Sequence, residues 1–268
     1  MQVAEVLLLE GGTGNTASGA GTYVGGGLAN GATQQYATVG GGQSNNAQSS
    51  SSTVSGGQGN TANNGAFATV GGGVNNQASN NSATVGGGNG NTASGLDATV
   101  PGGATNAASG DFSSAIGFKA NATNYGQFSQ SSGSFVFANQ GDAQTSVYVL
   151  RGKIPFNSFA APLSLDGAGT EVTIPANTSF AFRLMVTARV PVTGNSAAYI
   201  IEGSVKSAGG AVTIVSSPVT AYANGFVSGN IVLLGIGANT FRILINDSNN
   251  SNPPVGWVAR LETTEITF

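Results

Sequence analysis

The acidic side chains are the residues of this sequence with the clearest capacity for acid–base chemistry. A glycoside hydrolase needs two carboxylates about 5 to 10 Å apart. Residues 11–125 offer only Asp97 and Asp111, whereas the second half of the chain contains Asp166, Glu171, Glu202, Asp247, Glu262 and Glu265. Because the second half also contains five arginines, we expect these carboxylates to form surface ion pairs. We therefore predict a protein that is not an enzyme.

Other reactive residue types are missing. The sequence contains no histidine and no cysteine, which removes the commonest general base, the commonest metal ligand and any disulfide. The segment GGGNGN at 86–91 is similar to the glycine-rich calcium repeat of secreted toxins, but it lacks the aspartates and the nine-residue period. No glycine run is followed by the Lys-Ser/Thr of a phosphate loop. We predict no metal site and no cofactor.

Two polar segments of the second half are candidate recognition loops. Aromatic and amide side chains provide the flat apolar faces and hydrogen-bonding groups that carbohydrate binding requires. The loops are PFNSFAAP at 155–162 and NDSNNSNPPVG at 246–256, and the candidate residues are Phe156, Asn157, Phe159, Asn249, Asn250, Asn252 and Trp257. The alternative interpretation is that Phe156 and Phe159 cap a hydrophobic core.

The charge and hydropathy of the chain exclude several classes of partner. With 8 basic and 11 acidic residues, the net charge of −3 provides no basic surface for nucleic acid. The apolar run Val6 to Leu9 is too short for a secretory signal, and no stretch approaches the ~20 apolar residues of a membrane helix. We expect no membrane insertion and no export signal.

A glycine-rich phrase is repeated through the first half of the chain. ATVGGG stands at 37–42, 68–73 and 83–88, with near-copies between and beyond these positions. Its apolar column recurs at nearly equal intervals and contains Val39, Val54, Val70, Val85, Val100 and Ile116. A second column contains Asn45, Asn60, Asn76, Asn91 and Asn106, each followed at the second position by alanine. This agreement of columns identifies a structural repeat.

A unit of about 15–16 residues fits one coil of a parallel β-solenoid with two short strands and glycine turns. Equivalent positions of stacked coils lie ~4.8 Å apart, so a charge kept in the repeat would face its own copies. Asparagine can form a ladder of side-chain hydrogen bonds in such a stack. The stack therefore explains why Asp97 is the only charged residue between Gly11 and Gly110.

The interior of such a roll would be thin. Its repeated residues are mainly alanine and valine, and we do not expect burial at about 25 cal/mol per Å² to offset the ordering of so many glycines. We therefore expect several copies to bury one face of each coil against the others.

The second half of the chain has fewer glycines and more alternation of apolar and polar residues. Eight segments have the pattern of strands: 145–152, 171–175, 180–190, 197–206, 211–216, 230–235, 240–246 and 255–268. Their short polar connections predict an antiparallel β-sandwich of jelly-roll type. The fold class is thus all-β, a parallel solenoid followed by a sandwich.

The segment TASGLDATVPGGATNAASGDFSSAIGFKANA at 92–122 resembles the YadA-like head repeats of trimeric autotransporter adhesins, which also occur in phage tail fibres. The resemblance covers about residues 11–125 and implies three chains packed as parallel β-rolls about one axis. The ending, GDAQTSVY at 141–148 with WVARLET at 257–263, resembles C-terminal knob domains of phage tail proteins.

These resemblances imply a homotrimeric phage fibre that attaches to a host surface glycan or protein and is located on the virion. The expected parts are an attachment segment at 1–10 for other virion proteins, a shaft at 11–125, a connector at 126–144 and a tip at 145–268.

Three alternatives remain open. The chain could be a capsid or tail decoration without a receptor, or a fragment of a bacterial adhesin. An ice-binding solenoid is the third, because one column contains Thr38, Thr53, Thr69, Thr84 and Thr99. The paired T-x-T columns of a flat ice-binding face are missing, and threonine also suits an ordinary strand.

Overall fold

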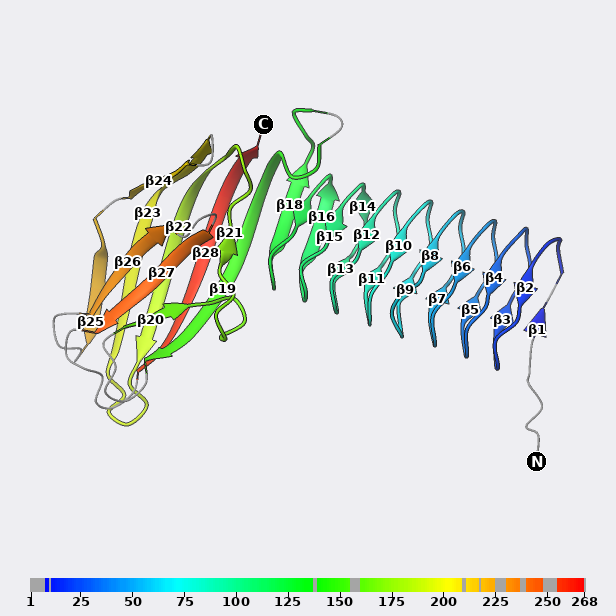
Figure 1. The fold of residues 1–268 in the computed structure, drawn as a ribbon, viewed down its shortest axis with the longest axis horizontal. Coiled ribbons are helices and arrows are strands. Elements are labelled where there is room, and N and C mark those ends of the chain that lie inside the picture. The colour runs from blue at the N-terminus through cyan, green and yellow to red at the C-terminus, as the bar shows by residue number, and fades with distance from the viewer. Residues whose placement is uncertain are drawn as a thin grey trace. The chain divides into compact units, whose positions relative to one another are not determined.

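A computed structural model describes residues 8–9, 11–136, 139–154, 160–208, 211–216, 218–224, 230–236, 240–247 and 255–267. The chain divides into two compact units, Met1–Gly141 and Asp142–Phe268. Every regular element in these described ranges is a strand, and none of them contains a helix that could span a membrane. The all-β fold class is confirmed (Figure 1).

The first unit is a parallel β-solenoid, here called the roll. One of its two sheets has eight strands: β2 (Thr16–Ala17), β4 (Gly31–Ala32), β6 (Asn46–Ala47), β8 (Thr61–Ala62), β10 (Gln77–Ala78), β12 (Thr92–Ala93), β15 (Ala107–Ala108) and β17 (Asn121–Ala122). The other contains β1 (Leu8–Leu9), β3 (Tyr23–Val24), β5 (Thr38–Val39), β7 (Thr53–Val54), β9 (Thr69–Val70), β11 (Thr84–Val85), β13 (Thr99–Val100), β16 (Ser114–Phe118) and β18 (Phe128–Ser132), with β14 (Gly103–Ala104) beside β16.

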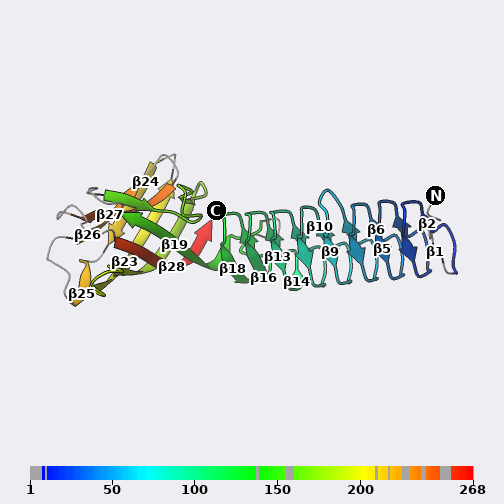
Figure 2. The ribbon, with the colours of Figure 1, turned by 90° about the horizontal axis from the view of Figure 1, so that it is seen from below.

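The coils of the roll are stacked in register, as the repeated phrase predicts (Figure 2). Val39 pairs with Val54, and Val54 with Val70, so each repeat unit forms one coil of the stack. The pairing begins at Leu8–Leu9 and continues to Ser132, beyond both ends of the repeat recognised in the sequence. Isolated bridges add a third row, here called the bridge column: Thr13, Leu28, Gln43, Gln58, Val74, Asn89 and Ala104.

Small side chains fill the interior of the roll. The valines of the Thr-Val pairs and most alanines of the two sheets are fully buried, whereas the threonines of those pairs are only partly buried. This alternation follows from the two-residue period of a strand.

Ile116 does not belong to the interior column, contrary to the prediction. Thr99 pairs with Ser114, so Ala115 follows Val100 in the stack and is fully buried. Ile116 comes one residue later in the strand and is only half-buried, because successive side chains point to opposite faces. The interior column therefore continues from Val100 to Ala115, one position earlier than the prediction placed it.

Buried asparagines connect each coil to the next. The Asn76 Nδ2 donates to the carbonyl oxygens of Gly72 at 2.8 Å and Gly88 at 2.9 Å, and its Oδ1 accepts from the Asn91 backbone N–H at 2.9 Å. The same pattern of donors recurs at Asn45, Asn60, Asn91 and Asn106. Each buried amide is satisfied, which removes the cost of burying it.

Two of the three glycines in a triplet are required by the closeness of the coils. A Cβ on Gly86 would lie 2.3 Å from the Pro101 carbonyl oxygen, and one on Gly88 only 2.0 Å from the Gly103 carbonyl oxygen. Gly88 also has a φ of +93°, which favours glycine. A Cβ on Gly87 would meet its nearest atom at 4.0 Å, which is ordinary contact.

The second unit is an antiparallel sandwich. Its larger sheet has the order β19 (Ala143–Ile154), β28 (Val255–Thr267), β22 (Thr178–Arg189), β23 (Ser196–Ala208) and β24 (Ala211–Ser216), with β25 (Thr220–Asn224) also paired to β23. Its smaller sheet contains β20 (Ala160–Leu163), β21 (Val172–Thr173), β26 (Asn230–Ile236) and β27 (Thr240–Asp247). All eight predicted strands are present; β20 and β25 were not predicted.

Aromatic rings connect the two sheets of the sandwich. The Phe241 ring of β27 lies 6.1 Å from that of Phe180 and 5.2 Å from that of Phe182, both on β22. Arg183 and Arg189 of the same strand are exposed on its other face. The predicted alternation of this strand is therefore confirmed.

Candidate functional site

Most of the predicted receptor-binding residues lie outside the described residues. These are Phe156, Asn157, Phe159, Asn249, Asn250 and Asn252. Trp257 is described and is only 2% exposed, with its ring stacked on that of Tyr199 at 5.9 Å. It presents no ring face to a ligand, so its assignment to a recognition site was wrong. The alternation of Val255, Trp257, Ala259 and Leu261 could have identified it as a core residue.

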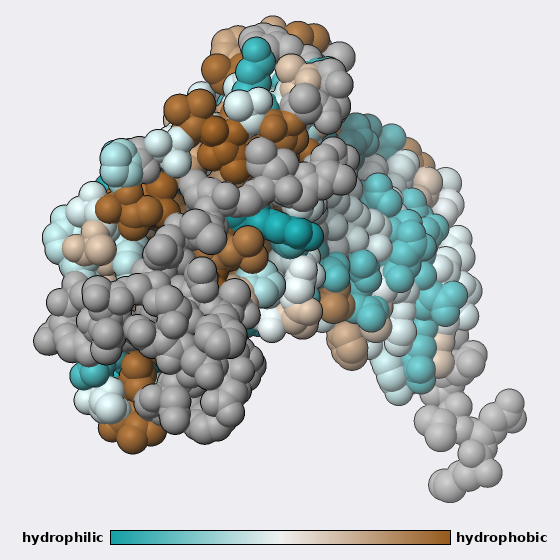
Figure 3. All heavy atoms as spheres, turned by 60° about the vertical axis from the view of Figure 1, so that its left-hand side comes forward, coloured by the Kyte–Doolittle hydropathy of each residue, from teal (hydrophilic) through white to brown (hydrophobic). Residues whose placement is uncertain are grey.

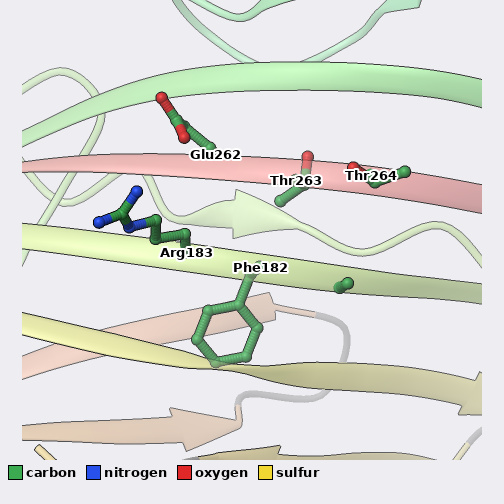
Figure 4. Close-up of a pocket in the computed structure, with 6 residues that line it drawn as sticks. Phe182, Arg183, Glu262, Thr263 and Thr264 are labelled. Atoms are coloured by element: carbon green, nitrogen blue, oxygen red, sulfur yellow. The ribbon is translucent and has the colours of Figure 1, made fainter.

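The outer face of the larger sheet has a hollow of about 270 Å³ over β22 and β28. It is lined by Ala181, Phe182, Arg183, Glu262, Thr263 and Thr264. Arg183 is the register partner of Glu262, and Ala181 is that of Thr264. The short side chain of Ala181 leaves space beside the long side chains of Arg183 and Glu262. In Figure 4 the Arg183 and Glu262 side chains extend away from the Phe182 ring, which points to the opposite side of the sheet.

Ion pairs surround this hollow. Arg183 Nε lies 3.5 Å from Glu202 Oε1, and Arg260 Nη2 lies 2.7 Å from Glu262 Oε1. Their side chains are about half exposed, so each pair contributes little to stability. The register places Arg183 between Glu262 and Glu202 on neighbouring strands. These groups offer donors and acceptors to a polar ligand on the sheet face.

Exposed aliphatic residues accompany the charges on this face. Val149 of β19 is the register partner of Arg260, and Val258 of β28 is that of Arg151. Both valines are more than half exposed. Figure 3 shows hydrophobic residues gathered at several places on the visible side of the sandwich. The outer face therefore combines apolar and charged contacts.

The expectation that the carboxylates form ion pairs holds for Glu171, Glu202 and Glu262, which contact Arg242, Arg183 and Arg260 respectively. It is wrong for Glu265, which is 8% exposed on the inner face of the larger sheet. Its carboxylate accepts from Gln144 Nε2 at 2.9 Å, from Tyr148 Oη at 3.4 Å and from the Thr263 hydroxyl. These hydrogen bonds offset part of the free-energy cost of burying the Glu265 carboxylate.

Asp166 also has a local role. It accepts hydrogen bonds from the Thr170 hydroxyl at 2.6 Å and from the backbone N–H groups of Ala168, Gly169 and Thr170 at 2.8 to 3.0 Å. These hydrogen bonds lower the pKa of Asp166 well below its usual range. The bond from the Thr170 hydroxyl has the largest effect, and the backbone donors follow. The carboxylate thus closes an exposed turn.

Among the described residues, no group of three or more acidic side chains is placed to hold a metal ion. The sequence has no histidine or cysteine to supply other ligands.

Comparisons with known proteins give structural neighbours only, since no family model and no curated protein matches. The tailspike of Acinetobacter baumannii phage AM24 is 9% identical with a TM-score of 0.28, over 89% of this chain and 51% of that one. The tailspike of Acinetobacter phage vB_ApiP_P1 is 9% identical with a TM-score of 0.28, over 92% and 54%. The tailspike of Acinetobacter baumannii bacteriophage Fri1 is 7% identical with a TM-score of 0.27, over 89% and 50%. The chain spans about half the length of these structures.

The Fri1 tailspike is described as a capsular polysaccharide depolymerase, which is an enzyme. This neighbour overturns the expectation from the sequence that the chain is not an enzyme.

Proposed function

We propose that this chain is part of a phage fibre that attaches the particle to polysaccharide on the host cell surface. The observation that carries the proposal is the presence, in one chain, of an in-register roll with few charges and an antiparallel sandwich with a mixed surface. Stacked repeats suit a long, stiff spacer. Polysaccharide is the proposed ligand class because hydroxyl groups match the exposed ion pairs, and it is the class named for the Fri1 tailspike.

The proposed fibre is a homotrimer located on the virion. The roll has an interior of small side chains, yet Leu28 and Val74 of the bridge column remain partly exposed. Burial of these residues against neighbouring copies would add to the thin interior. In this proposal residues 11–125 form the shaft, 126–144 the connector and 145–268 the tip, while residues 1–10 bind other virion proteins.

The proposed contact surface of the tip is the outer face around Arg183 and Glu262. The hollow beside them accommodates a small part of a ligand, and the flanking valines provide apolar contact. The loops at 155–162 and 246–256 remain a prediction from the sequence.

Retention of the intact, fluorescently labelled protein on bacteria tests this function. The cells are a panel of strains, each paired with a derivative that lacks its surface polysaccharide. We expect at least one strain to retain the protein, and its derivative to retain about tenfold less, because polysaccharide supplies the contacts. Equal retention by both members of every pair, or none by any strain, would contradict the proposal.

A further inference from the structure

One corner of the roll varies from coil to coil, although the rest of the coil is repeated. Its residues all have positive φ, between 51° and 66°, and are here called the corner column: Gly21, Tyr36, Ser51, Phe67, Ser82, Asp97, Phe112 and Gly126. Backbone bonds hold the column in register, since each N–H from Tyr36 onward donates to a carbonyl of the preceding coil at 2.7 to 3.0 Å. The roll therefore does not present the same surface at every level.

Three of these corners bear aromatic side chains that the fold does not require. Serine occupies the same backbone conformation at Ser51 and Ser82, so a small residue is sufficient. A bulky residue with positive φ is unfavourable. Nevertheless Tyr36, Phe67 and Phe112 stand there, with 60%, 63% and 48% of their surfaces exposed. The backbone conformation of the corner therefore does not explain the aromatic side chains.

Neighbouring coils orient two of the rings. A Cβ on Gly21 would lie 2.7 Å from Tyr36 Cδ1, so the tyrosine ring covers the glycine of the preceding corner. The Phe112 ring lies 5.2 Å from that of Tyr125. Rings held in this way lose less freedom when they bind a ligand.

The spacing of the rings follows the coils. Tyr36 and Phe67 are two coils apart, which corresponds to about 10 Å, and Phe67 and Phe112 are three coils apart, about 14 Å. A surface for packing identical rolls would be expected to repeat its apolar residues at every coil. Ser51, Ser82 and Asp97 interrupt this one. The pattern favours an elongated ligand over a second copy of the chain.

The surroundings of the rings indicate the chemistry of that ligand. Exposed amide side chains precede two of them, Gln34 and Gln35 before Tyr36 and Asn64 before Phe67, whereas the exposed Asp111 precedes Phe112. The corner column contains no basic residue, and its one charge is Asp97. Aromatic faces beside amides match the C–H faces and hydroxyl groups of sugar rings, and an anionic ligand would find no cation in the column.

We infer that the corner column is a binding stripe for a neutral oligosaccharide that lies along the roll. The rings of Tyr36, Phe67 and Phe112 stack on sugar faces, and Gln34, Gln35 and Asn64 bond to hydroxyl groups. The inference rests on the proposed function, and it adds a site on the shaft to the proposed contact surface of the tip.

The test uses the intact chain and an array of immobilised neutral hexose oligosaccharides, with uronic-acid oligosaccharides of the same lengths beside them. The variant combines Tyr36→Ser, Phe67→Ser and Phe112→Ser, because serine is native at neighbouring corners. The control combines Val192→Ser and Tyr222→Ser, because both side chains are exposed and neither belongs to the roll or to the proposed contact surface of the tip. We expect native protein to bind a neutral oligosaccharide. The binding signal of the triple variant should be about tenfold lower than that of native protein, and the signal of the control should be unchanged.

Several results would overturn the inference. These are no binding of native protein to any neutral oligosaccharide, stronger binding to the uronic-acid series, or undiminished binding by a triple variant with native circular dichroism. A fall in molar mass by light scattering in the triple variant would show that the rings join copies of the chain instead. If native protein is retained on cells and the triple variant is retained equally, the proposed function stands and this inference fails.

Discussion

Replacing Val70 with aspartate is expected to lower the free energy of unfolding of the roll by about 3–5 kcal/mol. Val70 is 0% exposed and lies between Val54 and Val85 in the stack, so a carboxylate there has neither water nor a cation beside it. Because domains are stable by only about 5–15 kcal/mol, the loss should be visible as a large fall in thermal midpoint by circular dichroism.

Two controls introduce the same charge at other positions of the roll. Ser44→Asp and Asn64→Asp change exposed residues whose φ values of 57° and 58° aspartate tolerates. Each should change the stability by about 1 kcal/mol or less. Losses at either control as large as the loss at Val70 would mean that the interior and exterior of the coil are wrongly assigned.

Asn76→Asp is expected to cause the second-largest loss, about 3 kcal/mol or more, although the two side chains have nearly the same shape. The amide nitrogen that donates to Gly72 and Gly88 would be replaced by a carboxylate oxygen facing two carbonyl oxygens. Chemical denaturation of native and variant protein at neutral pH measures the difference.

The pH dependence of this variant provides a further check. Burial raises the pKa of the introduced carboxyl above its unfolded value, so the penalty is complete above the folded pKa. The part of the penalty due to the charge should decrease as the pH falls and disappear below the unfolded pKa, while the loss of one of the two donated bonds remains. Asn75→Asp, at the exposed neighbouring position, is the matched control and should have little effect. A loss at Asn76 that stayed constant with pH would argue against the buried-charge explanation.

The sequence predicts the roll well because every coil has the same packing and hydrogen-bonding requirements, which select the same residue types at each repeat. The columns of Val39 and Asn45 are visible as repeated letters, and in the structure these residues are buried one above another. Ile116 was assigned to the interior column because it is a large apolar residue at about the repeat spacing from Val100. The alternation within β16 instead decides which side chain points inward, and that residue is Ala115.

The candidate sites were less predictable. Trp257 was assigned to a recognition site because it directly follows the loop at 246–256, although its alternation with Val255 and Ala259 places it in the core. The Glu265 carboxylate was expected on the surface, since the sequence does not show that Gln144 and Tyr148 would lie beside it from a distant strand. The corner column is visible only after stacking, because Tyr36 and Phe67 are far apart in the sequence yet separated by only two coils.

The proposed attachment function is tested most directly by electron microscopy of phage particles purified from a lysate that contains this protein, labelled with an antibody against residues 142–268. We expect the label at the free ends of fibres that project from the tail, where the tip would meet the host surface. Label distributed over the capsid, with no projecting fibre, would contradict attachment and favour a decoration protein.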